Sequence, residues 1–145
     1  MCFVRGPNEV AIFVARRSRA EVLVVHRSPQ GGGYWHTIAG AVEDGETPAE
    51  AAARELLEET GLDRAPTATD ISFVYPLENE PAARRAEYTP GLTGVNVDCF
   101  IVDADDDWEP VLDDEHVEYR WSAAGDAPGS LYWDDIADAL RRALA

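Results

Sequence analysis

The chain has 145 residues, of which 46% are hydrophobic; this suffices for one sizeable core but not for two ordinary domains, so we expect a single domain over residues 1–145. The formal net charge is −16 at pH 7, and all 12 basic residues are arginines. Such an acidic surface argues against general binding to nucleic acid or anionic membranes, and the lack of lysine excludes Schiff-base chemistry and a phosphate-binding loop that ends in lysine.

Short segments rich in Val, Ile and Phe are predicted as strands along most of the chain. The first two are joined by a polar turn over 16–20, and the third follows a flexible glycine-rich loop over 29–33. The predicted strands are Glu9–Ala15, Glu21–His26, Tyr34–Ala39, Ile71–Pro76, Val95–Val102 and His116–Ser122.

Two segments have helical spacing of their apolar residues: Pro48–Thr60, and a stretch from about Trp133 to Leu144. Between them, Glu78–Gly94 is a long polar loop, and a loop of that length in a compact domain is more often functional than idle. No apolar run approaches a membrane span, and Cys2 and Cys99 are too few for a disulfide framework or a thiolate zinc site. We therefore expect a cytoplasmic protein with no membrane partner, either a monomer or a homodimer.

The helix over Pro48–Thr60 has strong local signals at both ends. Thr47 suits the N-cap, Glu50 completes a capping box with it, and Gly61 stands where a left-handed C-cap belongs. The residues expected to form its buried stripe are Ala49, Ala52, Ala53, Leu56 and Leu57.

Three carboxylates lie on the C-terminal half of this helix. Glu55 is three residues from Glu58 and four from Glu59, which places all three around one face. The three carboxylates repel one another and lie near the negative end of the helix dipole, which is unfavourable. An i,i+4 contact of Arg54 with Glu58 or Glu50 relieves this only in part. A solvated acidic face is one interpretation; the other is a site for a hard cation, Mg²⁺, Mn²⁺ or Ca²⁺.

The wider context favours the cation site. Gly40, Glu46, Arg54-Glu55-Leu56, Glu58-Glu59 and Gly61-Leu62 match every defined position of the Nudix box, G-x5-E-x7-R-E-U-x-E-E-x-G-U, where U is bulky and aliphatic. The chain therefore resembles the Nudix hydrolases over these 23 residues. The resemblance implies an α/β fold, an α/β/α sandwich around a mixed sheet, and Mg²⁺-dependent hydrolysis (with Mn²⁺ as a substitute) of a small-molecule, nucleotide-like polyphosphate.

Carried over by position, the resemblance makes Glu55, Glu58 and Glu59 metal ligands. Arg54 orients these carboxylates, Glu46 joins the preceding loop to the helix, and Gly40 and Gly61 are structural positions of the motif, with Gly40 also beside the substrate. The Ala39 carbonyl is a further metal oxygen. Here the sequence reads Ile-Ala-Gly in place of the commoner Pro-Gly-Gly, from which we expect an altered fit around the substrate.

A narrower resemblance lies outside the box. The segments Tyr88–Thr93 and Glu115–Trp121 look like those of bacterial dihydroneopterin triphosphate pyrophosphohydrolases, a Nudix group. This match makes Glu115, rather than Asp113, Asp114 or Glu118, a distal metal ligand or water-activating carboxylate, and it places Tyr88 at the substrate. Nucleoside triphosphates are the next choice of substrate, followed by ADP-ribose or another nucleotide sugar and by dinucleoside polyphosphates.

Other residues have two interpretations each. Arg27, Arg84 and Arg85 either bind phosphate groups or are exposed arginines without a role, and Trp35 either stacks on a base or belongs to the core. His26, His36 and His116 lack metal-ligand spacing and are expected to be structural. The acidic run at 103–107 is expected to be a solvated turn.

The mechanism that these residues favour is metal-assisted substitution at phosphorus without a covalent intermediate. Glu58, Glu55 or Glu115 accepts the proton of the attacking water, and the sequence leaves this choice open. The rival hypotheses are a non-catalytic nucleotide-binding regulatory module, in which we would expect a broken box, and a structural acidic domain, which leaves the spacing of the box unexplained.

Overall fold

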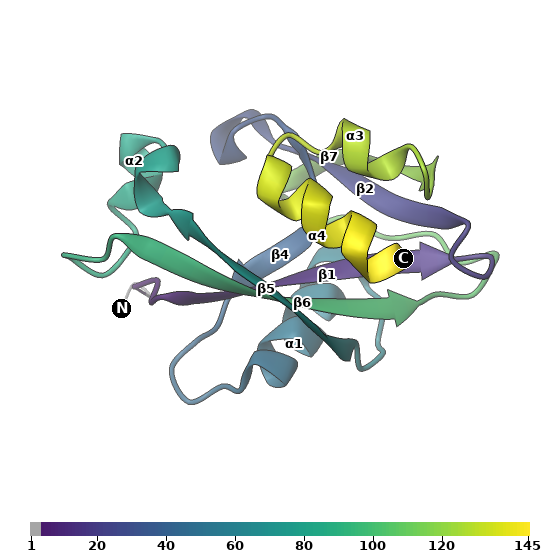
Figure 1. Ribbon diagram of the computed structural model, residues 1–145, viewed down its shortest axis with the longest axis horizontal. Helices are drawn as coiled ribbons and strands as arrows, with labels where there is room; N and C mark the ends of the chain where they lie inside the picture. The colour runs from purple at the N-terminus through teal and green to yellow at the C-terminus, as the bar shows by residue number, and fades with distance from the viewer. Residues whose placement is uncertain (1–3) are drawn as a thin grey trace.

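The computed structural model describes residues 4–145, so Cys2 lies outside the described residues. In this part of the chain, seven strands form one mixed sheet in the order β3-β2-β1-β6-β5, with β4 paired to β1 and β7 paired to β2 (Figure 1). The strands are β1 (Asn8–Arg16), β2 (Glu21–Arg27), β3 (Trp35–His36), β4 (Ile38–Ala41), β5 (Thr67–Pro76), β6 (Gly94–Asp103) and β7 (His116–Ala123).

The central strand β1 organises the sheet. It runs parallel to β6 from Asn8 opposite Asn96 to Ala15 opposite Asp103, and antiparallel to β4 along its first half. The six residues 10–15 are all at most 1% exposed, because helices cover both faces of the sheet.

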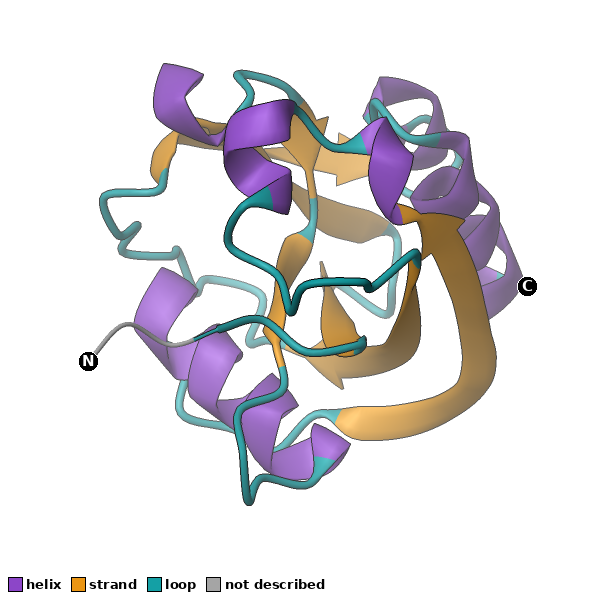
Figure 2. Ribbon diagram, turned by 90° about the vertical axis from the view of Figure 1, so that its left-hand side faces the viewer, coloured by secondary structure: helices purple, strands orange, loops and turns teal. Residues whose placement is uncertain are grey.

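One helix covers one face of the sheet and two cover the other (Figures 1 and 2). Helix α1 (Pro48–Thr60) packs its Ala52 and Leu56 against one face, and α3 (Ala127–Ser130) and α4 (Asp134–Leu144) cover the opposite face. This arrangement confirms the predicted α/β/α sandwich. No helix among the described residues is both long and apolar enough to cross a membrane.

Several element boundaries differ from the prediction. The segment Tyr34–Ala39 is not one strand: β3 pairs with β2 and β4 with β1, and the chain changes partner at Thr37, whose buried hydroxyl donates to the Ile12 carbonyl at 2.8 Å. Strand β5 begins four residues earlier than predicted. Short helical turns that the sequence did not indicate are η1 (Pro29–Gly31), η2 (Leu77–Asn79), α2 (Ala82–Arg85) and α3.

The buried stripe of α1 was predicted only in part. Ala52 and Leu56 are buried as expected, but Leu57 is 48% exposed and Ala49 is exposed as well. The stripe continues instead through Glu59 and Thr60, together with Ala51 at the other end. The helix therefore turns a carboxylate, in place of Leu57, toward the body of the protein.

Candidate active site

The loop that precedes α1 is held to the helix by Arg54. Its guanidinium donates to both oxygens of Glu46, at 2.7 and 2.9 Å, and to the Ala41 carbonyl at 2.9 Å. It also donates to Glu55 at 2.7 Å and to Glu58 at 3.3 Å. Arg54 thus occupies the position expected of an orienting residue, but it has no contact with Glu50, whose carboxylate is engaged in the capping box.

Gly40 brings the backbone of β4 against the carboxylate of Glu55. A Cβ atom placed on Gly40 would overlap this carboxylate. Gly40 is fixed in the sheet opposite Val10, so only a residue without a side chain allows Glu55 to lie here. The neighbouring Ala39 lines the same cavity as Glu55.

Glu59 is the most deeply buried of the three helix carboxylates, at 2% exposure. Its Oε2 atom has no hydrogen-bond partner among residues 4–145. Burial, reinforced by the nearby charge of Glu55, raises the pKa of Glu59 well above its usual value, and burial also raises the pKa of Glu55. Buried carboxylates without compensating donors are costly, and a hard divalent cation would remove that cost.

A histidine that the sequence analysis set aside lies beside Glu59. The His116 side chain is 2% exposed, its Nε2 lies 3.6 Å from Glu59 Oε1, and its Nδ1 lies 2.9 Å from Asp113 Oδ1. Glu59, Asp113 and His116 form the one cluster of potential metal-ligating side chains found among the described residues. The only signal in the sequence was that His116 follows Glu115, in a segment selected for its resemblance to relatives.

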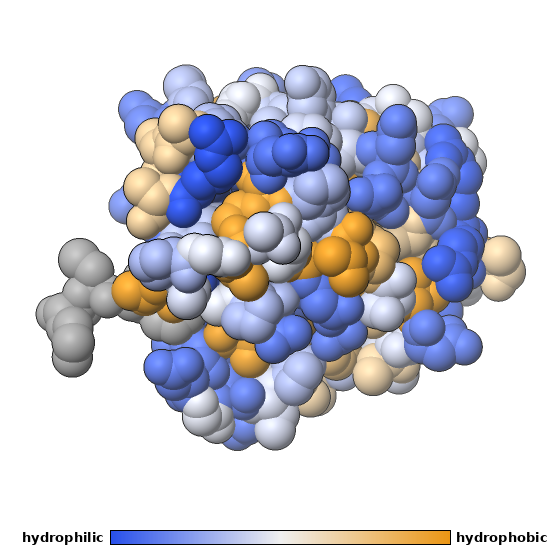
Figure 3. Space-filling model, turned by 60° about the vertical axis from the view of Figure 1, so that its left-hand side comes forward, coloured by the Kyte–Doolittle hydropathy of each residue, from blue (hydrophilic) through white to orange (hydrophobic). Residues whose placement is uncertain are grey.

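Glu55 and Glu58 of α1 border a cavity of about 250 Å³ that extends over the α4 face of the sheet, whereas Glu59 is not among the residues that line it. Its lining includes most of the residues predicted at the site: Arg27, Ala39, Gly40, Arg54, Glu55, Glu58, Arg84 and Glu115. Tyr34, Phe73 and Trp133 add aromatic surface. On the face seen in Figure 3, hydrophobic side chains also form patches among hydrophilic ones. The cavity therefore combines carboxylates, arginines and aromatic rings.

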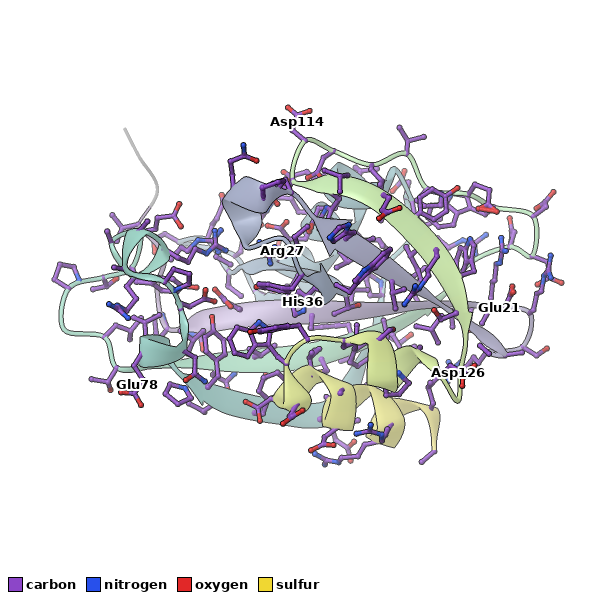
Figure 4. All side chains as sticks on the ribbon, turned by 90° about the horizontal axis from the view of Figure 1, so that it is seen from above. Glu21, Arg27, His36, Glu78, Asp114 and Asp126 are labelled. Carbon is purple, nitrogen blue, oxygen red and sulfur yellow. The ribbon has the colours of Figure 1, made fainter. Side chains whose placement is uncertain are left out.

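Arg27 and His36 lie close together on this cavity (Figure 4). Burial and the positive charge of Arg27 lower the pKa of His36 to about 3, so its imidazole is neutral. The Arg27 guanidinium lies 5.5 Å from the centre of the Tyr34 ring, and its Nε has no hydrogen-bond partner among residues 4–145. An arginine with an unpartnered Nε, beside a neutral histidine, can bind an anionic group.

Comparison with known proteins identifies the family. Residues 7–143 match the family described as NUDIX domain. The chain belongs to the Nudix family. The residues of the box from Pro48 to Thr60 form α1, and the expectation of a pyrophosphohydrolase enzyme is confirmed. Nudix hydrolases use divalent metal ions, and the cluster of Glu59, Asp113 and His116 is a possible metal-binding group in this chain.

Curated relatives of several kinds match this Nudix chain. An octanoyltransferase of Myxococcus xanthus is 35% identical over 136 residues, and the match covers 94% of this chain but 36% of that protein, so the chain spans about a third of its length. Dihydroneopterin triphosphate diphosphatases of Haemophilus influenzae and Escherichia coli K12 are 28% and 29% identical, over 97% and 87% of this chain and 89% and 82% of theirs.

Solved structures confirm the Nudix fold. The E. coli dihydroneopterin triphosphate pyrophosphohydrolase superposes with a TM-score of 0.84 at 22% identity, over 98% of this chain and 97% of that one. A NUDIX hydrolase structure from Listeria monocytogenes gives 0.74 at 27% identity, over 93% and 90% of the two chains.

Two predicted substrate residues of the Nudix chain lie outside the cavity lining. Arg85 donates to the carbonyls of Glu78 and Glu80 and so stabilises the turn around α2. Tyr88 is 3% exposed and donates to the Glu9 carboxylate at 2.6 Å. Glu9 does line the cavity, so Tyr88 reaches it only through Glu9.

The four acidic residues near β7 differ in whether they lie close to the helix carboxylates. Glu115 and Asp113 line the cavity, and the charges of both contribute to the raised pKa of Glu59. Asp114 is exposed and points away from the body of the protein (Figure 4). Glu118 is exposed and lies 3.0 Å from His26, and neither residue lines the cavity. Two acids, Glu115 and Asp113, therefore remain near the helix carboxylates.

Proposed function

We propose that the chain is a divalent-metal-dependent Nudix enzyme that releases pyrophosphate from a triphosphate carrying a planar heterocycle, with dihydroneopterin triphosphate as the preferred substrate. One observation carries this proposal: two carboxylates of α1, two arginines and an aromatic wall border a single cavity. These residues are Glu55 and Glu58, Arg27 and Arg84, and Tyr34, Phe73 and Trp133. The activity of the relatives from H. influenzae and E. coli, and their similarity to most of this chain, support the choice of substrate.

The residues present fit a divalent cation. Glu59 Oε2 is buried and has no hydrogen-bond partner among the described residues, and the close approach of Gly40 holds Glu55 beside it. All the donors are carboxylate or carbonyl oxygens, as Mg²⁺ and Mn²⁺ prefer. Glu55, Glu58, Glu59, Glu115 and the Ala39 carbonyl would hold the cation. When bound, it neutralises phosphate charge and lowers the pKa of a water.

The protein's own groups position the reactants. Arg54 fixes the positions of Glu55 and Glu58 through hydrogen bonds. Glu55, Glu58 or Glu115 accepts the proton from the attacking water. The water oxygen forms a bond to phosphorus as the phosphoanhydride bond breaks, and pyrophosphate departs with the bonding electrons. Arg27 and Arg84, which line the same cavity, would offset the negative charge of the triphosphate.

The heterocycle lies against the aromatic wall in this proposal. Trp133 meets Tyr34 edge-on with ring centres 5.8 Å apart, and Phe73 lines the same cavity from β5. A flat ring system is stabilised by stacking on such surfaces, and this stacking does not require specific hydrogen bonds to the edge of the ring. Nucleoside triphosphates share this feature and are the second candidate substrates.

The test is a hydrolysis screen that compares kcat/KM on dihydroneopterin triphosphate, nucleoside triphosphates, ADP-ribose and a dinucleoside polyphosphate. We expect dihydroneopterin triphosphate to be best and to yield pyrophosphate. Activity should be lost in excess chelator and return with Mg²⁺ or Mn²⁺. Undiminished turnover in chelator contradicts the metal role, and a higher kcat/KM on ADP-ribose contradicts the substrate.

Glu115→Gln should weaken metal-dependent turnover about tenfold or more, because this carboxylate borders the cavity and its charge acts on Glu59 of α1. The matched control is Glu118→Gln, since Glu118 is three residues further along the chain, lies 3.0 Å from His26 and does not line the cavity. Turnover measured across a range of Mg²⁺ concentrations separates the two variants. Equal effects in both would remove Glu115 from the site.

A further inference from the structure

His116 is a buried contact between β7 and the metal-binding helix. The strand begins at His116, and its imidazole lies between two carboxylates that are distant in sequence, Asp113 on the preceding turn and Glu59 on α1. The imidazole is 2% exposed and the Glu59 side chain 3%, so neither group contacts bulk water. Such a burial of polar groups calls for a specific arrangement of their partners.

The two ring nitrogens have different partners. Nδ1 lies 2.9 Å from Asp113 Oδ1, a hydrogen-bond distance, and because a carboxylate accepts, Nδ1 carries the hydrogen. This bond fixes the plane of the ring. Nε2 then lies 3.6 Å from Glu59 Oε1, which is longer than a hydrogen bond, so this edge of the ring restricts Oε1 by packing against it.

We propose that His116 is a positioning residue that orients Glu59, so that Oε1 faces the imidazole and Oε2 is left for the cation. This inference rests on the proposed function and deepens it. Glu59 Oε2 is the one buried carboxylate oxygen without a hydrogen-bond partner among residues 4–145. A carboxylate that is held before the cation arrives loses less side-chain freedom on binding, which strengthens binding.

Two substitutions separate this role from a purely structural one. Gln at position 116 places its amide near the location of Nε2, so it keeps a group packed against Glu59 while losing the contact with Asp113. Asn reaches only as far as Nδ1, so it keeps the Asp113 contact and loses Glu59. The matched control is His26→Gln, because His26 has a similar contact with Glu118 at 3.0 Å, away from the cavity.

The measurement is Mn²⁺ affinity without substrate, by electron paramagnetic resonance titration, with thermal unfolding of each variant. We expect His116→Asn to weaken Mn²⁺ binding about 10- to 100-fold, and His116→Gln and His26→Gln to stay within about threefold of wild type. Wild-type affinity in His116→Asn, or equal losses in the Asn and Gln variants, overturns the inference. If the Asn variant does not fold, a loss beyond about threefold in the Gln variant overturns it.

Glu59→Gln in the same titration distinguishes the two levels of the argument. If wild type binds Mn²⁺ and Glu59→Gln binds it weakly, the proposed metal site stands and the result at His116 decides the inference alone. If Glu59→Gln binds Mn²⁺ as wild type does, the assignment of Glu59 as a ligand fails, and the positioning role of His116 fails with it.

Discussion

Glu59→Gln is expected to lower kcat with Mg²⁺ by about a hundredfold or more, while the fold remains intact. Outer partners of metal ligands already contribute about 10- to 100-fold to metal affinity or activity, and Glu59 is proposed as a ligand itself. Gln has nearly the same shape and is a good helix former, so α1 should persist. Without metal, Gln should also raise the melting temperature, because it removes a buried carboxylate whose ionised form is penalised by burial.

The control is Glu50→Gln on the same helix. Glu50 is exposed, and its carboxylate accepts from the Thr47 backbone N–H at 2.9 Å in the capping box. Gln serves equally well at this position of a capping box, so kcat and the melting temperature should both stay near wild type. Steady-state kinetics and thermal unfolding in chelator give both readouts. Equal losses of kcat in the two variants would show that the carboxylates of α1 do not divide their roles as proposed.

The parts of the fold that depend on neighbours in sequence could be predicted. The capping box of Thr47 and Glu50 is present as expected, and Gly61 ends α1 with a left-handed φ of 79°. These features arise from backbone hydrogen bonds over a few residues, so their sequence signals are complete in themselves. The fixed spacing of the Nudix box likewise identified the helix carboxylates, because a helix converts spacing into a shared face.

The parts that depend on distant contacts could not be predicted. His116 was expected to be merely structural. Its proximity to Glu59, which is 57 positions away in the sequence, arises only from the packing of α1 near β7. Leu57 was expected to be buried for its hydrophobicity, but the helix is rotated so that Glu59 faces inward. The placement of Tyr88 behind Glu9 likewise depends on how the loop before β6 folds onto β1. Composition and periodicity do not specify such pairings.

The break in the third predicted strand had no local signal either. Tyr34–Ala39 has the composition of one strand, yet the chain passes from β2 to β1 within it. This change of partner is what places Ala39 and Gly40 opposite Ala11 and Val10, beside the carboxylates of α1. The predicted strand is therefore interrupted at the candidate active site, where the backbone positions needed for the cavity differ from those of one regular strand.

Gly40→Ala is expected to reduce kcat/KM about a hundredfold or more and to lower the free energy of unfolding by about 1–3 kcal/mol, the usual cost of overpacking. The added methyl group would overlap the Glu55 carboxylate, and neither side can yield easily. Gly40 is held in β4 by its pairing with β1, and Glu55 is held by Arg54 at 2.7 Å. Glu55 would have to leave this position, and Arg54 would lose a partner.

The matched control is Gly125→Ala, because a Cβ atom on Gly125 meets nothing within 4 Å. This variant should keep wild-type kcat/KM and stability. Chemical denaturation and Mn²⁺ affinity distinguish a local displacement of Glu55 from general unfolding: a folded Gly40→Ala protein with weakened Mn²⁺ binding is the expected result. A folded Gly40→Ala protein with wild-type Mn²⁺ affinity and turnover would mean that Glu55 can leave its place beside Gly40 without cost, and that it is not a ligand there.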